Sequence, residues 1–405
     1  MSRFLELVNS RPVIYDGSMG ATILNMQLSV EDYGGKEGCN DYLVMTKPAV
    51  IEGIHASYLE AGADVLETDT FGGSLIKLEE YGLGELTYEL NRTAAELARR
   101  VAREYTTASA PRFVAGSIGP TGLLPASEDP MLGQHRFQQV VDLFLDQIRG
   151  LVDGGVDVLI IETVQDILEL KAAIHAAIRI REETGVYVPI QASITLDTSG
   201  RMLLGTDIAA ALSIMEHLPV DIIGLNCSTG PDYMREPARY LGEYSTRPVS
   251  IIPNAGIPIN VNGLAVFPME PEPMARGLRE MVEEFEVGII GGCCGTTPQH
   301  IIEMSREIKT RPFTARPLKP LPQVASMIRA VDLKQDPAPN IIGERVNTLG
   351  SRKVKRLILA DDLDGVLEVA TSQMEEGAHT LDVCVALTER TDERDTMRKL
   401  VKKLA

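Results

Sequence analysis

The stretch "LVDGGVDVLIIETV" at residues 151–164 contains the pattern that decides the fold of this chain. A helical segment ends at a glycine beside an acidic residue, and a short run rich in β-branched apolar residues follows it. The stretches "YLEAGADVLETDTFGG" at 58–73 and "EHLPVDIIGLNCS" at 216–228 are close variants of this pattern. Because a short, uninterrupted apolar run is typical of a strand buried on both faces, the pattern predicts strands of a parallel sheet.

Further stretches of the chain predict strands of the same kind, at residues 12–20, 112–122, 188–197, 248–256 and 287–295. Segments with helical periodicity, such as residues 165–185, separate consecutive strands. Eight such units within roughly 300 residues fit an α/β fold of the (β/α)8 TIM-barrel type. A G-x-G-x-x-G sequence after the first strand would favour an open dinucleotide-binding sheet, and it is missing. We therefore expect a (β/α)8 barrel over residues 1–311.

Composition limits the class of protein. The chain has 405 residues, 44% of them hydrophobic, and a formal net charge of −18. Its acidic and basic residues are interleaved, which argues against a nucleic-acid or anionic-membrane partner. The apolar runs are shorter than the ~18 residues that span a bilayer, and the N-terminal sequence has no secretory apolar region, so we expect a cytoplasmic protein. Five cysteines in a reducing compartment favour metal binding or catalysis over a disulfide framework.

The sequence changes character after residue 308. Residues 312–338 contain five prolines and predict an extended linker. The apolar stretch "NIIGERVN", a helical segment, the apolar stretch "HTLDVCVAL" and a charged helix follow. Two βα units cannot close a barrel, and they leave an unpaired strand edge. We expect residues 339–405 to be an incomplete second βα domain, either cut short or completed by something outside this chain.

Polar residues and cysteines gather at the predicted strand ends, where a (β/α)8 barrel carries its active site. They are Asp16, Asp69, Glu162, Asn226, Cys227, Asn254, Cys293 and Cys294. Cysteines therefore end the sixth and eighth strands, and three thiolates around an open fourth position suit zinc. Spacing alone leaves two other interpretations open, a vicinal disulfide and cysteines that only pack in the core.

Several motifs together resemble a known family. The motifs "YDGSMGATI", "ETDTFGGS", "GSIGPTG", "LNCSTGP", "PNAG" and "GGCCGTTPQHI" follow one another along about residues 10–310. Their sequence and order are similar to those of the homocysteine S-methyltransferase family. The stretch "GERVNTLGSRK" at 343–353 resembles the opening of the pterin-binding domain of the cobalamin-dependent methionine synthases.

The resemblance implies a zinc-dependent methyltransferase that acts on homocysteine. It implies that zinc is bound by Cys227, Cys293 and Cys294, and that the homocysteine sulfur is the fourth ligand. A free thiol has a pKa near 8.5, whereas a metal-bound thiol is deprotonated. Zinc would therefore make the thiolate that attacks a methyl group.

The resemblance also implies which residues contact the rest of the substrate. Asp16 and Glu162 match acidic positions near the substrate amino group. The backbone of Gly17 and Ser18 would bind the carboxylate, and Asn226 would be a further residue of the homocysteine site.

The methyl donor implied by the resemblance is methylcobalamin, with methyltetrahydrofolate as the possible source of its methyl group. The chain lacks a D-x-H-x-x-G corrinoid motif, so the corrinoid would belong to a domain or protein outside it. One alternative is a corrinoid-independent enzyme that takes its methyl group from betaine or S-methylmethionine. A second alternative is a thiol redox or zinc-storage protein.

The second resemblance implies residues of a pterin site, namely Glu344, Arg345, Asn347, Ser351, Arg352, Lys353 and Asp382. The family's Asp-x-Asn sequence at the second strand reads Asp382-Val-Cys384 here. Because an amide is lost there and the barrel is incomplete, we expect that these residues do not bind a pterin by themselves.

Overall fold

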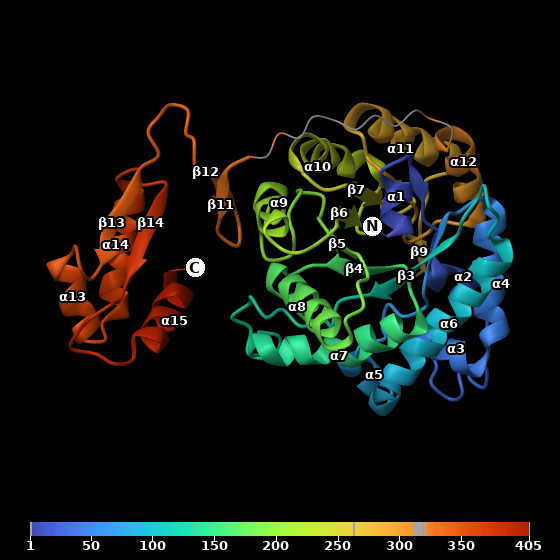
Figure 1. Cartoon of the computed structure of the whole chain (residues 1–405), viewed down its shortest axis with the longest axis horizontal. Helices are drawn as coiled ribbons and strands as arrows, with labels where there is room; N and C mark the ends of the chain where they lie inside the picture. Colours follow the sequence, from blue (N-terminus) through green and yellow to red (C-terminus); the bar gives the residue numbers. More distant parts are fainter. Residues whose placement is uncertain are drawn as a thin grey trace. The chain divides into compact units, whose positions relative to one another are not determined.

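The computed structural model describes residues 2–404, apart from residues 134, 262–263, 310, 312–318 and 320. The chain divides into two compact units, Met1–Pro320 and Leu321–Ala405, which we describe separately. Figure 1 shows the elements of both units.

The first unit is built on an eight-stranded parallel sheet with the order β1-β10-β7-β6-β5-β4-β3-β2. Its strands are β1 (Val13–Ile14), β2 (Val65–Glu67), β3 (Phe113–Ile118), β4 (Val158–Val164), β5 (Ile190–Ile194), β6 (Ile222–Asn226), β7 (Val249–Ile252) and β10 (Ile289–Ile290). Each lies within one of the eight predicted stretches. A parallel bridge between Tyr15 and Val65 joins the two end strands and closes the sheet. The prediction of a (β/α)8 barrel is confirmed.

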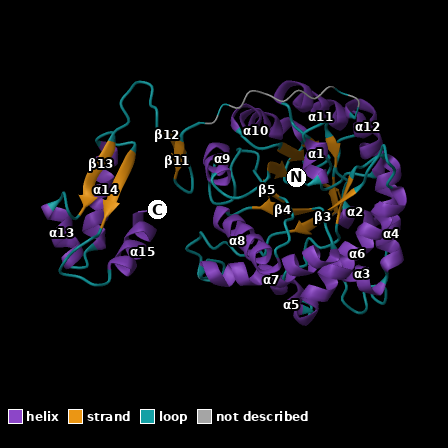
Figure 2. Ribbon diagram, viewed as in Figure 1, coloured by secondary structure: helices purple, strands orange, loops and turns teal. Residues whose placement is uncertain are grey.

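Helices follow the strands and surround the sheet (Figure 2). The helices of this outer layer are α4 (Pro48–Ala61), α6 (Thr87–Tyr105), α7 (Phe137–Gly154), α8 (Ile167–Thr184), α9 (Ile208–Glu216), α10 (Pro231–Tyr244), α11 (Pro271–Phe285) and α12 (Pro298–Ile308). The last of them contacts the first, so the helical layer also closes. Shorter elements lie between β1 and β3, namely α2 (Met19–Asn25), η1 (Asn40–Tyr42), α3 (Leu43–Thr46), α5 (Leu75–Glu79) and η2 (Gly84–Leu86).

The glycine in the repeated sequence pattern ends a helix. Gly62 after α4 and Gly155 after α7 have φ angles of 108° and 87°. This left-handed conformation lets their N–H groups bond to carbonyls in the last helical turn, and glycine adopts it without a steric penalty. The chain then reverses directly into the next strand.

The core begins with the N-terminal helix. Helix α1 (Arg3–Val8) buries Phe4, which lies edge-on to Phe113 with 5.5 Å between the ring centroids. Phe4 also belongs to a buried cluster with residues of seven barrel strands, and Cys293 packs against this cluster. The metal-ligand loop predicted from the sequence therefore rests on the barrel core.

Two hairpins were not predicted from the sequence. Strands β8 (Ile259–Val261) and β9 (Leu264–Val266) pair antiparallel after β7. Strands β11 (Gln323–Ala325) and β12 (Ala330–Asp332) pair in the same way within residues 312–338, which we had expected to be extended.

The second unit contains a parallel pair of strands, β13 (Ile342–Asn347) and β14 (Thr380–Cys384). Its helices are α13 (Arg352–Leu359), α14 (Leu363–Glu375) and α15 (Glu393–Leu404). They form a small core around Val346, Val354 and Leu400. Ile342 on β13 is 59% exposed, so this strand still has an uncovered apolar position within the unit.

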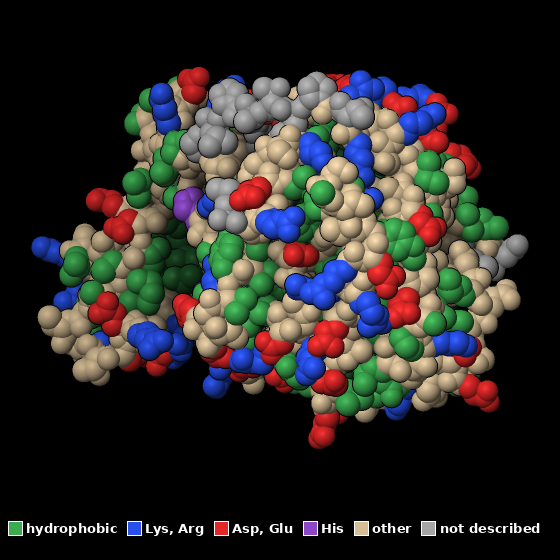
Figure 3. All heavy atoms as spheres, turned by 45° about the vertical axis from the view of Figure 1, so that its right-hand side comes forward, with side chains coloured by type: hydrophobic (Ala, Val, Ile, Leu, Met, Phe, Trp, Pro, Cys, Tyr) green, Lys and Arg blue, Asp and Glu red, His purple; other side chains and the backbone are tan. Residues whose placement is uncertain are grey.

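The surface is mixed in charge. On the face shown in Figure 3, acidic and basic side chains are interspersed, with no large patch of one sign. None of the helices in the described ranges is both long enough and apolar enough to cross a membrane.

A buried carboxylate stabilises the closure of the barrel. Asp64 directly precedes β2, its side chain is fully buried, and its Oδ2 accepts the Ile14 N–H at 3.1 Å across the β1–β2 seam. Arg11 donates to both of its oxygens at 2.9 Å. Arg112 at 3.3 Å and Lys309 at 3.0 Å complete the cluster. Burial opposes ionisation, but the hydrogen bond from Arg11 and the charge of Lys309 prevail and lower the pKa of Asp64.

We predict that Asp64→Asn destabilises the barrel by about 3–5 kcal/mol at pH 7, because three cationic side chains then lose their buried partner. Since the folded-state pKa of Asp64 lies below its unfolded value, this contribution is complete above about pH 4 and is lost as the pH falls further. Urea unfolding at pH 7 and at pH 3 measures both effects. The control is Asp142→Asn, which breaks an exposed pair with Arg179 and should cost less than about 1 kcal/mol. Equal losses from the two variants would contradict the prediction.

Candidate active site

A pocket of about 570 Å³ opens at the carboxyl ends of the barrel strands. This volume lies within the range that is usual for small-molecule sites. Five strand ends contribute side chains to it, with Asp16 after β1, Glu67 on β2, Ser117 on β3, Glu162 on β4 and Cys227 after β6. Gly292, Cys293 and Cys294 line it from the loop after β10. The closed sheet thus brings together residues that are far apart in the sequence.

Three cysteines form a compact cluster in this pocket. The sulfur atoms of Cys227, Cys293 and Cys294 all lie within 4.8 Å of one another, and the first and third are 3.8 Å apart. Four ligands arranged tetrahedrally around zinc at about 2.3 Å would place their sulfur atoms about 3.8 Å apart. The donor set and its spacing therefore fit a zinc ion.

The backbone around the cysteines is held in unusual conformations. Cys227 and Ser228 have φ angles of 61° and 64°, which non-glycine residues rarely adopt. Gly295 has a φ of 78°, and a Cβ there would lie 2.2 Å from the Cβ of Phe267. Backbone strain of this kind persists only where the surrounding structure enforces it, and it clusters at functional sites.

The three thiols differ in their tendency to ionise. Hydrogen bonds from Cys227 and Cys293 lower the pKa of the Cys294 thiol to about 3. A thiolate is the form of cysteine that binds metals. The cluster therefore presents a ready anionic sulfur to a cation.

Asp16 and Glu162 lie at the floor of the pocket, 3% and 5% exposed. Asp16 accepts the Glu67 N–H at 3.0 Å, and Glu162 accepts the Ser117 hydroxyl at 2.5 Å. Burial raises the pKa of Glu162 to about 7 and raises the pKa of Asp16 well above its usual value. Two desolvated carboxyls would gain stability from a cationic group between them.

Asn226 forms hydrogen bonds with residues at the end of β4. Its Nδ2 donates to Glu162 at 3.1 Å, and its Oδ1 accepts the Thr163 N–H at 2.7 Å. Thr163 has a φ of 57°, so the amide holds a left-handed turn directly after Glu162. In this structure Asn226 positions Glu162.

Gly17 and Ser18 lie where β1 leads into α2. Ser18 is the N-cap of α2, and its own N–H donates to Thr296 Oγ1 at 3.1 Å. A substrate carboxylate bound through that N–H would have to replace this hydrogen bond. A Cβ on Gly17 would lie 2.8 Å from Thr296 Oγ1 and from Tyr58 Cε1, so the space allows only glycine here.

Sequence analysis missed Glu67, which ends β2 and lines the pocket. We had selected Asp69 for this strand end, and Asp69 also lines the pocket. The sequence contained a signal for Glu67, because it directly follows an apolar run of the repeated pattern, as Glu162 does in the copy at 151–164.

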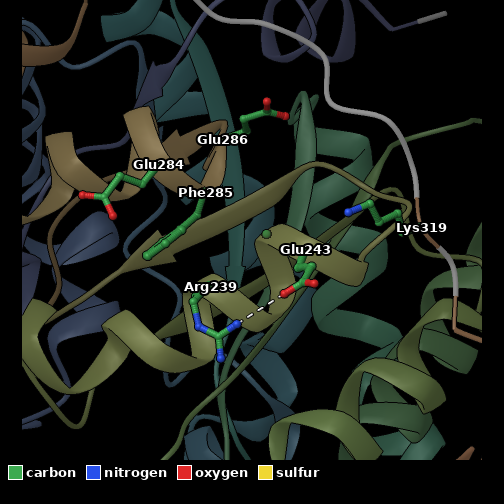
Figure 4. Close-up of a pocket in the computed structure, with 7 residues that line it drawn as sticks. Arg239, Glu243, Glu284, Phe285, Glu286 and Lys319 are labelled. Carbon is green, nitrogen blue, oxygen red and sulfur yellow. Dashed lines mark hydrogen bonds and ion pairs between the residues drawn. The ribbon is translucent and has the colours of Figure 1, made fainter.

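A second cavity, of about 320 Å³, lies at the opposite end of the barrel, beside the C-terminal ends of α10 and α11. Figure 4 shows Arg239 and Glu243 in an ion pair beside it. Because active sites of this fold lie at the carboxyl ends of the strands, this cavity is at the wrong end for one.

In the second unit, the predicted pterin residues lie on and after β13 and β14. Asn347 Nδ2 donates to Asp382 Oδ2 at 2.8 Å, so these two side chains meet. Ser351 caps α13, and Arg352 and Lys353 form its first turn. Glu344 is exposed on β13, and Arg345 pairs with Glu376.

Comparisons with known proteins agree with this geometry. The family model "Homocysteine S-methyltransferase" matches residues 13–308, and the model "Pterin binding enzyme" matches residues 343–405. Methionine synthases from Mycobacterium leprae and Mycobacterium tuberculosis are each 39% identical to the chain over 99% of its length. The chain spans 33% of each of these relatives.

Among solved structures, the homocysteine methyltransferase MmuM from Escherichia coli, in its metallated form, superposes with a TM-score of 0.59. The match covers 75% of this chain and 98% of MmuM at 22% identity, which supports the fold. The family model covers most of the chain and includes the whole cysteine and carboxylate pocket. The chain therefore belongs to the homocysteine S-methyltransferase family.

Proposed function

We propose that the chain catalyses zinc-dependent methyl transfer to the thiol of homocysteine, which yields methionine. The observation that carries the proposal is the cluster of three cysteine sulfurs within 4.8 Å of one another, in the same pocket as two buried carboxyls. Homocysteine has a thiol that suits the first group and an ammonium that suits the second.

Each homocysteine-site and metal-site residue predicted from the sequence has a role in the proposal. Cys227, Cys293 and Cys294 would hold the zinc ion and leave one position for the substrate sulfur. Bound zinc supplies the positive charge that keeps the substrate thiol deprotonated at neutral pH. Asp16 and Glu162 bind the ammonium and so orient the sulfur, and Asn226 keeps Glu162 in place. The backbone at Gly17 and Ser18 is the proposed site for the carboxylate.

The proposed methyl donor is methylcobalamin, carried by a corrinoid-binding domain or protein outside this chain. Support comes from the relatives, which are methionine synthases about three times as long as this chain. The match of residues 343–405 to pterin-binding enzymes supports methyltetrahydrofolate as the earlier source of the methyl group. Two strands cannot enclose a ligand, so we propose that this segment needs further strands to bind it.

We predict that Cys227→Ser lowers the zinc content from about one ion per chain to near zero, because one of three thiolate ligands is lost. Methyl transfer from free methylcobalamin to homocysteine should fall by more than about 100-fold. Metal analysis under reducing conditions and a methionine assay measure these effects. The matched control is Cys384→Ser in the second unit, which should change neither. A zinc-free Cys227→Ser protein with full activity would rule out the zinc mechanism.

Homocysteine binding at pH 7 should release roughly one proton per site, because the substrate thiol loses its proton as its sulfur becomes a ligand. Calorimetry in buffers of different ionisation enthalpy measures the number. We expect no proton release when methionine, the S-methylated form of homocysteine, is titrated instead, because it has no thiol proton. A binding heat independent of the buffer would contradict thiolate formation.

Removal of residues 321–405 should leave zinc content unchanged and activity with free methylcobalamin within about threefold of the intact chain, because each unit has its own core. Circular dichroism and thermal unfolding check that the shortened chain still folds. A folded but inactive product would show that the second unit contributes to the reaction.

A further inference from the structure

We propose that Glu67 is a third ligand of the substrate ammonium and makes the site specific for a thiol that carries an α-amino group. This inference rests on the proposed function and assigns a role to a residue that the motif comparison did not select.

Glu67 lines the pocket together with Asp16 and Glu162. It ends β2, next to β1 in the closed sheet, and its backbone N–H donates to Asp16 Oδ2 at 3.0 Å. Asp16 and Glu162 both act electrostatically on its side chain, and all three residues line the same cavity. The carboxyls therefore converge from three strands of the barrel.

The three carboxyls differ in their hydrogen bonds. Glu162 is held at one oxygen by Ser117 and at the other by Asn226. Asp16 accepts a backbone N–H. Glu67, in contrast, receives no hydrogen bond on its carboxyl group from the described residues, and it lines the open pocket. Its acceptors are available to a ligand.

An ammonium group matches this arrangement in number and in charge. It has three N–H donors, and Asp16, Glu67 and Glu162 offer it one carboxyl each. Burial, followed by the charges of Glu162 and Asp16, raises the pKa of Glu67 well above its usual value, so this carboxyl lacks a cation. Lys77 also lines the pocket, but its ammonium pairs with Glu80 at 2.9 Å. The substrate would supply the missing positive charge.

The test compares two ligands on the zinc-loaded full chain. L-homocysteine has the ammonium, and 4-sulfanylbutanoate is the same molecule without its amino group. Calorimetric dissociation constants should show that Glu67→Gln weakens homocysteine binding about ten- to hundredfold, as expected for loss of a charge-assisted hydrogen bond. Binding of 4-sulfanylbutanoate should change by less than about threefold or become tighter, because it makes no such bond.

Glu85→Gln is the matched control, since it removes the same charge from an exposed position outside the pocket lining. It should change neither dissociation constant, and zinc content should stay constant in every variant. Glu67→Asp keeps the negative charge but moves it back by one methylene group, so it should lose less homocysteine affinity than Glu67→Gln. If Glu67→Gln does not fold, Glu67→Asp is used in its place.

Unchanged homocysteine binding in Glu67→Gln would overturn the inference and leave the proposed function intact. Equal weakening of both ligands, or the same effect from Glu85→Gln, would also overturn it. A wild-type chain that holds zinc but binds no homocysteine would overturn the proposed function and this inference with it.

Discussion

The closure of the parallel sheet between β1 and β2 is the constraint on which the rest of the structure depends. Strand β1 has only two residues, so its own backbone hydrogen bonds hold the junction between β1 and β2 only weakly and further contacts are needed. These contacts are the bridge from Tyr15 to Val65 and the ion pairs of the buried Asp64 with its three cationic partners. Because the sheet closes, the carboxyl ends of all eight strands form one ring, and Cys227 directly after β6 meets the cysteine pair after β10.

The groups that stabilise the barrel and the groups of the candidate active site lie at opposite ends of the strands. The Asp64 cluster lies at the amino ends of the strands, where this buried carboxylate is paired with three cationic side chains. At the carboxyl ends, Thr163, Cys227 and Ser228 have left-handed backbone conformations, and the carboxyls of Asp16, Glu67 and Glu162 share one pocket. The pairing at one end provides the rigidity that keeps a strained, electrostatically unfavourable site in place at the other.

The second unit is stabilised by a small apolar core of its own. Two parallel strands and three helices bury Val346, Val354 and Leu400, while Ile342 stays exposed on the sheet. Asn347 and Asp382 meet at the ends of these two strands. The match of residues 343–405 to the model of pterin-binding enzymes therefore covers a unit whose described residues contain a single pair of parallel strands.

The sequence by itself determined the repeating unit and the cysteines. A helix ending at a left-handed glycine, followed by an apolar strand, is set by local backbone preferences, so the eight strands could be predicted from segments such as 151–164. The grouping of Cys227, Cys293 and Cys294 followed from strand ends and from motif order. Only the tertiary structure decided that Asn226 bonds to Glu162, that the Ser18 N–H is already paired, and that Glu67 joins Asp16. These contacts connect residues 51 to 278 positions apart, and their geometry depends on strand register and on loop packing, which local sequence does not encode.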